Sequence, residues 1–348
     1  MSEPLFPWIT PASAQPVWFA LEPFQPGFGL ANPHAQTLWD AVRPGSRGVR
    51  FQRERIDTPD GDFLDMDIAH VRGHDLSDKT PVVLLLHGLE GSARRPYALE
   101  AYRYLAARGI RAVGINYRSC SGEMNRRARF YHAGATDDVA TAHDWLDQRF
   151  PGVAKGMIGV SLGGNLLLKY LGERREELGI RLRGAVVVSP PFDLAMASDN
   201  IMGSSARRYL PGFLRSLRAK VRAKEQLLDG LIDVPRTLAA ASMREFDEAC
   251  TAPLHGFADA DDYYARCSAR RYLAGIRTPT LLLRAVDDPL IPAGDIPRDL
   301  IALNPTLTSG ITERGGHTGW VEGRPFAHHR WAERQAARFL AACLTPKQ

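Results

Sequence analysis

A strand-turn-helix signature in the middle of the chain constrains the fold more than any other feature. The segment from Met157 to Leu168 reads MIGVSLGGNLLL, an apolar run that is followed by an amphipathic helical pattern. Its centre has the form G-x-S-x-G, in which Ser161 ends the strand and Gly159 and Gly163 leave room for a sharp turn. We therefore expect the Ser161 hydroxyl to be exposed at the carboxyl edge of a sheet, with a helix N-terminus behind it.

The sequence around this motif alternates between strands and helices. Continuous apolar runs, PVVLLLHG, GAVVVSPP and TPTLLLRAV, are typical of strands that are buried on both faces of a parallel sheet. An alternating pattern over residues 49–71, with a turn at 59–61, predicts an antiparallel hairpin. Helices are expected at residues 96–108, 135–148 and 326–344, and a strand at 110–116. The chain is therefore predicted to form an α/β protein, with a mostly parallel twisted sheet and helices on both faces.

Three regions of the chain differ in pattern. Residues 1–48 are rich in proline and aromatic residues, so we expect an irregular arm that packs on the body. Residues 49–192 and 276–348 carry the alternation and form the expected core. Residues 193–275 show only helical patterning, and an insertion at this point lies over the carboxyl edge of the sheet. We expect this segment to be a helical cap, or lid, over a pocket. The aromatic residues of the arm are Trp8, Trp18, Phe19, Phe24, Phe28 and Trp39.

The composition is that of an ordinary globular protein and argues against several classes. A formal net charge of +5 is small for 348 residues and is spread along the chain, which gives little support to nucleic-acid binding. The cysteines lie far apart, without zinc-ligand or disulfide spacing. The N-terminal segment lacks a signal-peptide core, and no apolar run reaches the ~18 residues that span a bilayer. We expect a soluble, cytoplasmic protein with reduced thiols.

A serine acts as a nucleophile only with a histidine base and a carboxylate that orients it. In a fold with this motif, the three occur in the order serine, acid, histidine, each just beyond a strand. Asp288 follows the strand TLLLRAV and is the preferred acid, with Asp287 as the alternative. The alternatives to these catalytic roles are structural: a tight turn at Ser161 and a solvated turn at the two aspartates.

The candidate base is His317, which lies in GGHTGW after the next strand-like segment. Two other histidines, His328 and His329, also follow the acid but belong to a polar stretch that is expected to be helical and solvated. A structural role for His317 is the alternative. Two backbone amides should stabilise the negative charge that develops on the substrate oxygen: that of Leu162, directly after the serine, and that of Leu89 in the loop HGLEGS.

Several segments of the chain resemble a known family. The YheT-type branch of the α/β-hydrolase superfamily is similar in HGLEGS, NYRSCSGEMNR, FYHAGATDD, GVSLGGN, REFDEACTAPLHGFADADDYY, LLLRAVDDPLIP and GGHTGW. Its members are bacterial predicted esterases, related to eukaryotic α/β-hydrolase-domain proteins that act on lipid esters and phospholipids. The resemblance covers nearly the whole chain, including NPHAQTLW at residues 32–39. It implies the α/β-hydrolase fold, a triad of Ser161, Asp288 and His317, and ester hydrolysis without a metal or organic cofactor.

The expected reaction is hydrolysis of an apolar or lipid-like carboxylic ester through an acyl-enzyme on Ser161. A phospholipase or lipase, or an acyltransferase that delivers the acyl group to an alcohol, would use the same three residues. The alternative from another class is a non-catalytic binding protein on the same fold, because fold alone does not imply activity. The sequence does not predict the number of subunits.

Several other polar residues are expected to be structural. Three histidines without metal-ligand spacing are expected in the core or in hydrogen bonds; they are His34, His132 and His255. Cys120 is expected to be a buried thiol rather than a second nucleophile. Three aspartates are expected to cap a helix or make polar contacts in the cap, because they lack the rest of a calcium loop; they are Asp259, Asp261 and Asp262.

Residues 207–224 combine apolar residues at helical spacing with seven basic ones. Such a helix can touch an anionic membrane surface transiently. The favoured interpretation is a lid helix whose apolar face covers the acyl pocket and whose basic face is solvated.

Overall fold

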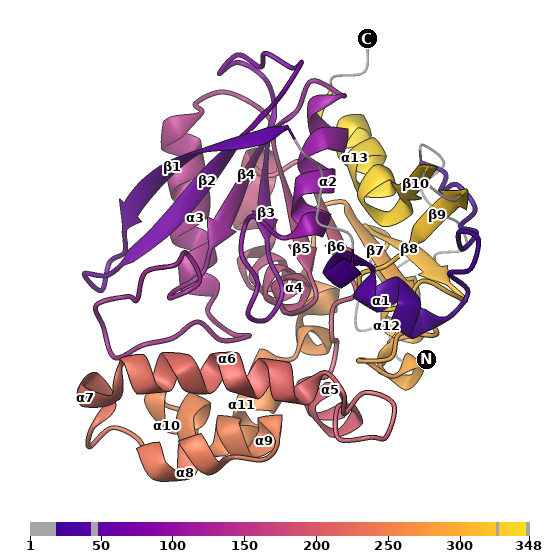
Figure 1. Cartoon of the computed structure of the whole chain (residues 1–348). Helices are drawn as coiled ribbons and strands as arrows, with labels where there is room; N and C mark the ends of the chain where they lie inside the picture. The colour runs from indigo at the N-terminus through magenta and orange to yellow at the C-terminus, as the bar shows by residue number, and fades with distance from the viewer. Residues whose placement is uncertain (1–18, 43–47, 325–326, 346–348) are drawn as a thin grey trace, which may run out of the picture.

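The computed structural model describes residues 19–42, 48–324 and 327–345. At its centre lies an eight-stranded sheet in the order β1-β2-β4-β3-β5-β6-β7-β8 (Figure 1). The pairs β1–β2 and β2–β4 are antiparallel and all the others are parallel. The strands are β1 (Val49–Asp57), β2 (Phe63–Val71), β3 (Val82–Leu86), β4 (Arg111–Asn116), β5 (Lys155–Val160), β6 (Gly184–Val188), β7 (Thr280–Ala285) and β8 (Leu307–Thr312). The predicted mostly parallel α/β sheet and its N-terminal hairpin are confirmed.

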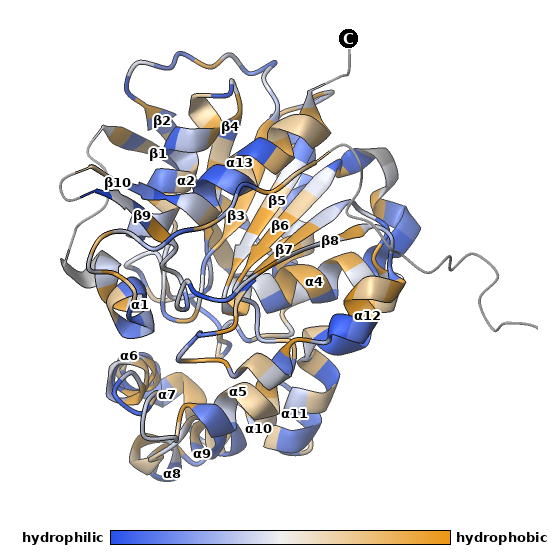
Figure 2. Ribbon diagram, turned by 90° about the vertical axis from the view of Figure 1, so that its right-hand side faces the viewer, coloured by the Kyte–Doolittle hydropathy of each residue, from blue (hydrophilic) through white to orange (hydrophobic). Residues whose placement is uncertain are grey.

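Helices cover both faces of this sheet. One hydrophobic cluster joins the sheet to α3 (Thr136–Arg149) and α4 (Leu162–Arg174), and a second joins it to α2 (Pro96–Ala106) and α13 (Trp331–Leu344). All residues of β3, β5, β6 and β7 are buried, which is why these strands consist of apolar or small residues without alternation, apart from Lys155 and Arg284. Figure 2 shows these central strands as the most hydrophobic part of the ribbon.

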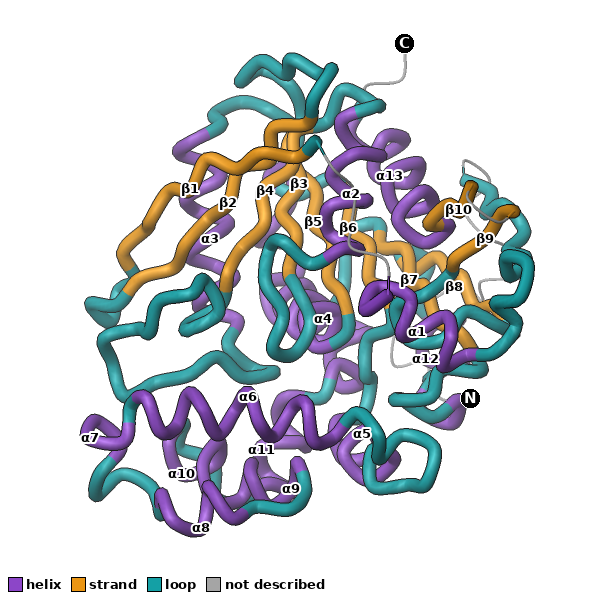
Figure 3. The backbone as a smooth tube through the Cα atoms, in the orientation of Figure 1, coloured by secondary structure: helices purple, strands orange, loops and turns teal. Residues whose placement is uncertain are grey.

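Between β6 and β7 the chain forms a separate helical layer, which we define as residues 194–267. It contains α5 (Leu194–Asn200), α6 (Leu210–Ala223), α7 (Glu225–Leu228), α8 (Val234–Ala239), α9 (Met243–Phe246), the π-helix η2 (Asp247–Thr251), α10 (Ala252–Leu254) and α11 (Ala260–Cys267). This layer has a hydrophobic cluster of its own. It lies beyond the carboxyl ends of the parallel strands (Figures 1 and 2), and α6 runs along the side that faces the sheet in Figure 1. Loops at this edge of the sheet lie between the strands and the helical layer (Figure 3).

The described part of the N-terminal arm packs on the body but is not wholly irregular. Phe19 and Phe24 contact Phe339 and Trp331 of α13, with ring centroids 5.1 and 5.7 Å apart. Phe28 is 81% exposed. The arm then forms a ten-residue helix, α1 (Pro33–Val42), which the prediction of an irregular arm missed. Trp8 and Trp18 lie outside the described residues.

The C-terminal helix was predicted to begin too early. The structure has a two-stranded sheet of β9 (Val321–Arg324) and β10 (Ala327–Arg330) before α13 begins at Trp331. His328 and His329 therefore lie in a strand, where His328 packs on the ring of Trp39 at 4.6 Å and His329 is exposed. Pairing with β9 decides this conformation, and a helical sequence pattern does not reveal such a partner.

The helix after Ser161 is buried, not amphipathic. Every residue from Gly163 to Gly172 in α4 is buried. The sheet covers one side of α4, and the 3-10 helix η3 (Ala269–Gly275) packs so closely on another that a Cβ at Gly172 would lie 2.3 Å from the carbonyl oxygen of Tyr272. A helix that is covered on several sides has no wide polar face.

Candidate active site

The serine lies at a strained turn between β5 and α4. Ser161 has φ 53° and ψ −122°, and α4 begins at the next residue. A Cβ at Gly159 would lie 2.4 Å from the carbonyl oxygen of Gly163, and a Cβ at Gly163 would lie 2.4 Å from that of Leu86. Both distances are far inside van der Waals contact, so only glycine fits at these two positions. The turn holds the serine outside regular backbone conformations, as a G-x-S-x-G elbow requires.

Side chains from three strand ends form a continuous hydrogen-bonded chain at this turn. His317 Nε2 lies 2.8 Å from Ser161 Oγ, and His317 Nδ1 lies 2.8 Å from Asp288 Oδ2. The ionised carboxylate can only accept a hydrogen bond, so the neutral imidazole carries its hydrogen on Nδ1 and presents the Nε2 lone pair to the serine hydroxyl. The structure thus brings together the serine, acid and histidine that were chosen from the sequence.

The Asp288 carboxylate is buried and well supplied with donors. Its Oδ1 accepts hydrogen bonds from the amides of Leu290 and Ile291 at 2.8 and 3.2 Å, and Arg284 Nη1 donates to Oδ2 at 2.6 Å. Burial by itself raises the pKa of Asp288, but His317, Arg284 and the Leu290 amide outweigh it and lower the pKa below its ordinary value. The acid is therefore ionised at neutral pH and can hold a protonated imidazole.

The neighbouring carboxylate, Asp287, has a different place. Its Oδ1 accepts a hydrogen bond from the Gly316 amide at 2.9 Å, and burial raises its pKa. Asp287 thus holds the backbone of the loop that carries His317, whereas Asp288 contacts the imidazole. The sequence left the choice between the two open, and the side-chain geometry favours Asp288.

Helix α1 also holds the loop that carries His317, a role that was not predicted from the sequence. Thr37 Oγ1 accepts a hydrogen bond from the His317 amide at 3.0 Å. The buried side chain of Gln36 donates to the carbonyls of Leu30 and Val321 and accepts from the Val321 amide at 2.7 Å. The sequence carries a signal for this contact in the polar segment NPHAQT, where glutamine and threonine are adjacent.

The loop after β3 is held on both sides of Leu89. The Gly88 amide donates to the Tyr97 hydroxyl at 3.1 Å, and the Glu90 amide donates to the Tyr131 hydroxyl at 2.7 Å. His87 Nδ1 hydrogen-bonds the Gly88 carbonyl at 2.8 Å, and burial lowers the pKa of His87 to about 3, so this histidine is a neutral support of the loop.

This arrangement leaves two amides available beside the serine. Within the described residues, the amides of Leu89 and Leu162 donate to no protein acceptor. Leu89 and Leu162 line the same cavity as Ser161, and a Cβ at Gly88 would lie 3.1 Å from the Ser161 Cβ, so the loop closely approaches the serine. Unpaired N–H groups at such a place can stabilise an oxyanion.

A cavity of about 490 Å³ lies between the core and the helical layer, with Ser161 and His317 in its wall. This volume is within the range of small-molecule pockets. Much of its lining is apolar, from α5, α6 and α9 and from the loop after β7, and includes Ala197, Phe213, Leu217, Phe246 and Ile291. A polar stripe of Asp247, Thr251 and His255, each four residues apart, interrupts this lining. The cavity suits a largely apolar molecule with a polar part.

The three histidines without metal-ligand spacing lie in two places. The rings of His132 and His255 meet at 4.4 Å, a contact that the sequence did not reveal, and burial lowers the pKa of His255 to about 4. His34 hydrogen-bonds Tyr209 and Ser205 of the helical layer at 2.8 and 2.9 Å. Across the ranges that the structure describes, no group of three or more histidine, cysteine or acidic residues could hold a metal ion.

The remaining polar candidates have structural contacts. Asp259 caps α11 by accepting a hydrogen bond from the Asp262 amide at 2.8 Å, and Asp261 pairs with Arg244. Burial raises the pKa of the Cys120 thiol, and Lys220 Nζ lies 3.1 Å from its sulfur. Cys120 is thus a partly buried thiol, less enclosed than expected.

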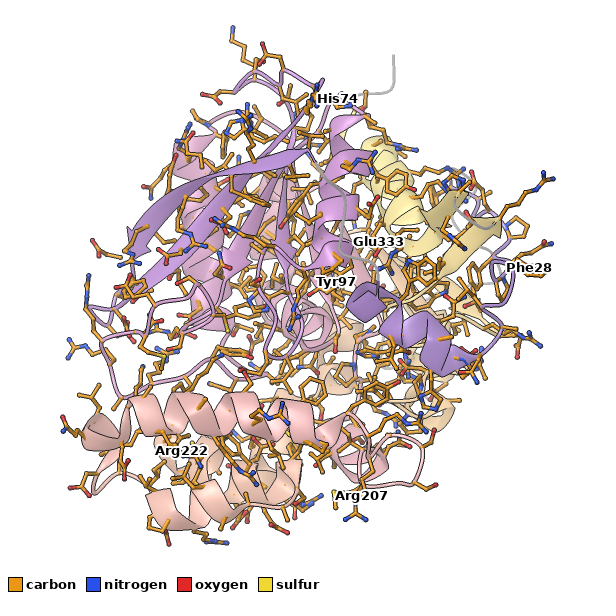
Figure 4. All side chains as sticks on the ribbon, viewed as in Figure 1. Phe28, His74, Tyr97, Arg207, Arg222 and Glu333 are labelled. Carbon is orange, nitrogen blue, oxygen red and sulfur yellow. The ribbon has the colours of Figure 1, made fainter. Side chains whose placement is uncertain are left out.

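The expectation that the basic face of residues 207–224 is solvated is wrong for two lysines. Lys224 is buried and donates to the carbonyls of Arg127 and Arg129 at 2.6 and 3.0 Å, and Lys220 binds Glu90 at 2.6 Å. Arg207 and Arg222 are exposed side chains of the helical layer (Figure 4). Charge patterning along one helix does not show which basic residues lie opposite an acceptor on the core.

No helix of the described chain is long and apolar enough to cross a membrane.

Comparison with known proteins agrees with this fold. Residues 81–323 match the family model of the alpha/beta hydrolase fold. The chain is 35% identical over 328 residues to the Escherichia coli (strain K12) protein named "Putative esterase YheT", and the match covers 93% of this chain and 94% of the other. The chain belongs to the α/β-hydrolase family and, within it, to the YheT-type branch.

More distant relatives include lipid hydrolases. The chain is 33% identical to the monoacylglycerol lipase of Saccharomyces cerevisiae, over 76% of this chain and 59% of the yeast protein. It is 29% identical to phospholipase ABHD3 of Bos taurus, over 93% and 79% of the two chains. Among solved structures, the Pyrococcus furiosus esterase Pf2001 matches with a TM-score of 0.50 at 18% identity, over 77% of this chain and 84% of the other. Esterase, lipase and phospholipase relatives support a hydrolase.

Proposed function

We propose that the protein is a serine carboxylic-ester hydrolase. Ser161 Oγ attacks the ester carbonyl while His317 Nε2 takes its proton, and the carbonyl oxygen becomes an oxyanion that the amides of Leu89 and Leu162 bind. The C–O bond then breaks, the alcohol leaves with the proton from His317, and an acyl-enzyme remains on Ser161. Water, deprotonated by His317, releases the carboxylic acid. Asp288 holds the imidazole and stabilises its charged form.

One observation carries this proposal. The chain from Ser161 Oγ through His317 to Asp288 has both hydrogen bonds at 2.8 Å, with the serine in the wall of a cavity. A purely structural role for His317 would not explain why Ser161 is held at positive φ or why two unpaired amides lie beside it. The same geometry argues against a non-catalytic binding protein.

The substrate in this proposal is an apolar or lipid-like ester, and the helical layer acts as a cap over it. The largely apolar cavity wall supports this class of substrate, as do the names of the yeast and bovine relatives. A lipase or phospholipase would use the same residues with a longer acyl site. An acyltransferase would differ only in the acceptor of the acyl group, and product analysis with added alcohols separates it from a hydrolase.

The test combines active-site labelling with turnover. Wild type and Ser161→Ala are treated with a fluorophosphonate probe, and both are assayed on p-nitrophenyl esters from acetyl to palmitoyl. We expect labelling and turnover in wild type and neither in the variant, with the same thermal unfolding for both. A wild type that neither labels nor hydrolyses any ester, or a variant that retains turnover, would contradict the proposal.

A further inference from the structure

We propose that Glu90 and Lys220 are positioning residues that tie the oxyanion loop to helix α6, so that the Leu89 amide is correctly set only when α6 lies against the core. This inference rests on the proposed function and adds to it a role for the helical layer. The layer would complete the active site as well as cover it.

The Glu90 side chain is the connection between the two parts. Its carboxylate binds Lys220 Nζ at 2.6 Å, accepts a hydrogen bond from the Tyr131 hydroxyl at 2.8 Å and accepts another from the Ser216 hydroxyl. Ser216 and Lys220 both belong to α6, one helical turn apart. The Glu90 side chain is only 5% exposed and that of Lys220 14%. The carboxylate therefore depends on α6 for two of its three partners.

The backbone of Glu90 explains why these partners matter for catalysis. Glu90 has φ 53°, a conformation that non-glycine residues adopt only when their surroundings hold them there. Glu90 directly follows Leu89, so a change in the Glu90 backbone moves the Leu89–Glu90 peptide. Through the backbone of Leu89, that movement also changes the orientation of the Gly88–Leu89 peptide, which carries the Leu89 amide. Without Lys220 and Ser216, the carboxylate would lose the contacts that favour this conformation. The loop could then relax and carry the amide away from the oxyanion.

Helix α6 offers a control at the same face. Ser216, Lys220 and Lys224 are each four residues apart, so they lie along one side of the helix. Lys224 is buried against the core like Lys220, but it binds the carbonyls of Arg127 and Arg129. Both lysines thus attach α6 to the core. Of the two, only Lys220 attaches it to the oxyanion loop. In Figure 1, α6 runs along the side of the layer that faces the sheet edge.

The experiment compares Lys220→Met with Lys224→Met on a short, soluble p-nitrophenyl ester. We expect Lys220→Met to lower kcat by about 10- to 100-fold with KM changed less than about twofold, because an oxyanion donor acts mainly on the transition state. Lys224→Met should lower the melting temperature by about as much as Lys220→Met does, but it should keep kcat within about twofold of wild type. Lys220→Arg, which retains the charge, should recover part of the lost kcat.

Two further measurements separate positioning from general damage to the fold. A trifluoromethyl ketone, which becomes a charged tetrahedral adduct, should lose affinity for Lys220→Met in parallel with kcat/KM, while inhibition by the product acid stays unchanged. The double variant Glu90→Gln with Lys220→Met should lose no more activity than the worse single variant, because both remove the same connection.

Three results would overturn the inference: equal kcat losses in the two methionine variants, a Lys220→Met effect confined to KM, or additive losses in the double variant. Each of these results presupposes an active wild type. Failure of the proposed function would instead appear as a wild type that neither labels nor turns over, so the two failures are distinguishable.

Discussion

Two adjacent carboxylates, Asp287 and Asp288, show how much a single residue position decides in this site. Asp288 contacts the imidazole of His317. Asp287 accepts a hydrogen bond from the amide of Gly316, the residue that precedes His317. Both side chains follow the same strand, and both are polar groups in a turn. Their difference is one of direction, because the turn after β7 points the two side chains at different parts of the His317 loop.

The two aspartates should therefore differ sharply on substitution. Asp288→Asn replaces the acceptor at His317 Nδ1 with an amide that favours the wrong tautomer, and we expect kcat to fall by about 10³- to 10⁴-fold. Asp287→Asn retains an oxygen for the Gly316 amide, and kcat should fall less than about tenfold. Steady-state kinetics of both variants on one ester gives the comparison. The larger loss in Asp287→Asn would reverse the assignment.

A second prediction at this scale concerns a buried acid outside the site. Glu333 of α13 lies beside Tyr97 at a cavity of about 10 Å³ (Figure 4), and its Oε2 has no hydrogen-bond partner among the described residues. Burial raises the pKa of Glu333 from 4.5 to about 7. The folded protein then holds more protons than the unfolded chain between these values, so this residue lowers stability as the pH rises through that range.

Replacement by the neutral Glu333→Gln should remove this pH-dependent loss. Relative to wild type, the free energy of unfolding of the variant should rise by up to about 3 kcal/mol between pH 4.5 and pH 8. Urea unfolding at the two pH values measures it, with the exposed Glu177→Gln as the control. A difference between variant and wild type that is independent of pH would contradict the assignment.

At the scale of elements, helix α1 of the arm completes the site of a core that begins after it in the chain. Gln36 fixes α1 to Val321, and Thr37 accepts the amide of His317. A Cβ at Gly316 would lie 2.7 Å from Thr37 Oγ1, so glycine is needed for this close approach. The arm is thus part of the scaffold of the proposed active site.

Thr37→Val should expose this connection, because it removes the hydroxyl with little change of shape. We expect a loss of stability of about 1 kcal/mol and a fall in kcat of about tenfold, since the His317 loop loses one acceptor. Thr37→Ser keeps the hydroxyl and serves as the matched control. Kinetics and thermal unfolding of both variants test the prediction, and equal kcat values for valine and serine would refute it.

At the scale of the whole molecule, the cavity exists only because the helical layer and the sheet edge meet. Its wall combines Ser161 and His317 of the core with residues of the layer such as Phe213 and Leu217. The layer also has its own hydrophobic cluster, so it can present a continuous wall to the substrate. In the proposed reaction, the preferred acyl chain length is therefore set by the core and the layer together.

Filling the cavity from the side of the layer should shorten the preferred acyl chain. Leu217→Trp adds volume at the cavity wall, and we expect the ratio of palmitoyl to butyryl ester turnover, compared as kcat/KM, to fall by about tenfold or more. Leu231→Trp is the control, because Leu231 is 53% exposed and lies outside the cavity lining. An unchanged ratio in Leu217→Trp would show that the acyl chain lies elsewhere.

Local patterns were sufficient to predict much of this protein. Apolar runs gave the strands β3, β6 and β7, and the fixed chain order of serine, acid and histidine selected Ser161, Asp288 and His317, which the structure brings together. The patterns failed where a partner distant in sequence decides the conformation. Strand β10 was predicted as helix because its pairing with β9 is not visible locally, and α4 was predicted as amphipathic because the covering by η3 is not visible either.

By itself, the sequence determined the fold class, the turn at Ser161 and the set of candidate catalytic residues, because these depend on periodicity, on glycine at two crowded positions and on chain order. Only the tertiary structure decided which of two aspartates faces His317, that α1 holds the histidine loop, and that Lys220 lies against Glu90. These contacts join residues 29 to 280 positions apart. Their geometry depends on how whole elements pack, and no local pattern in the chain encodes that packing.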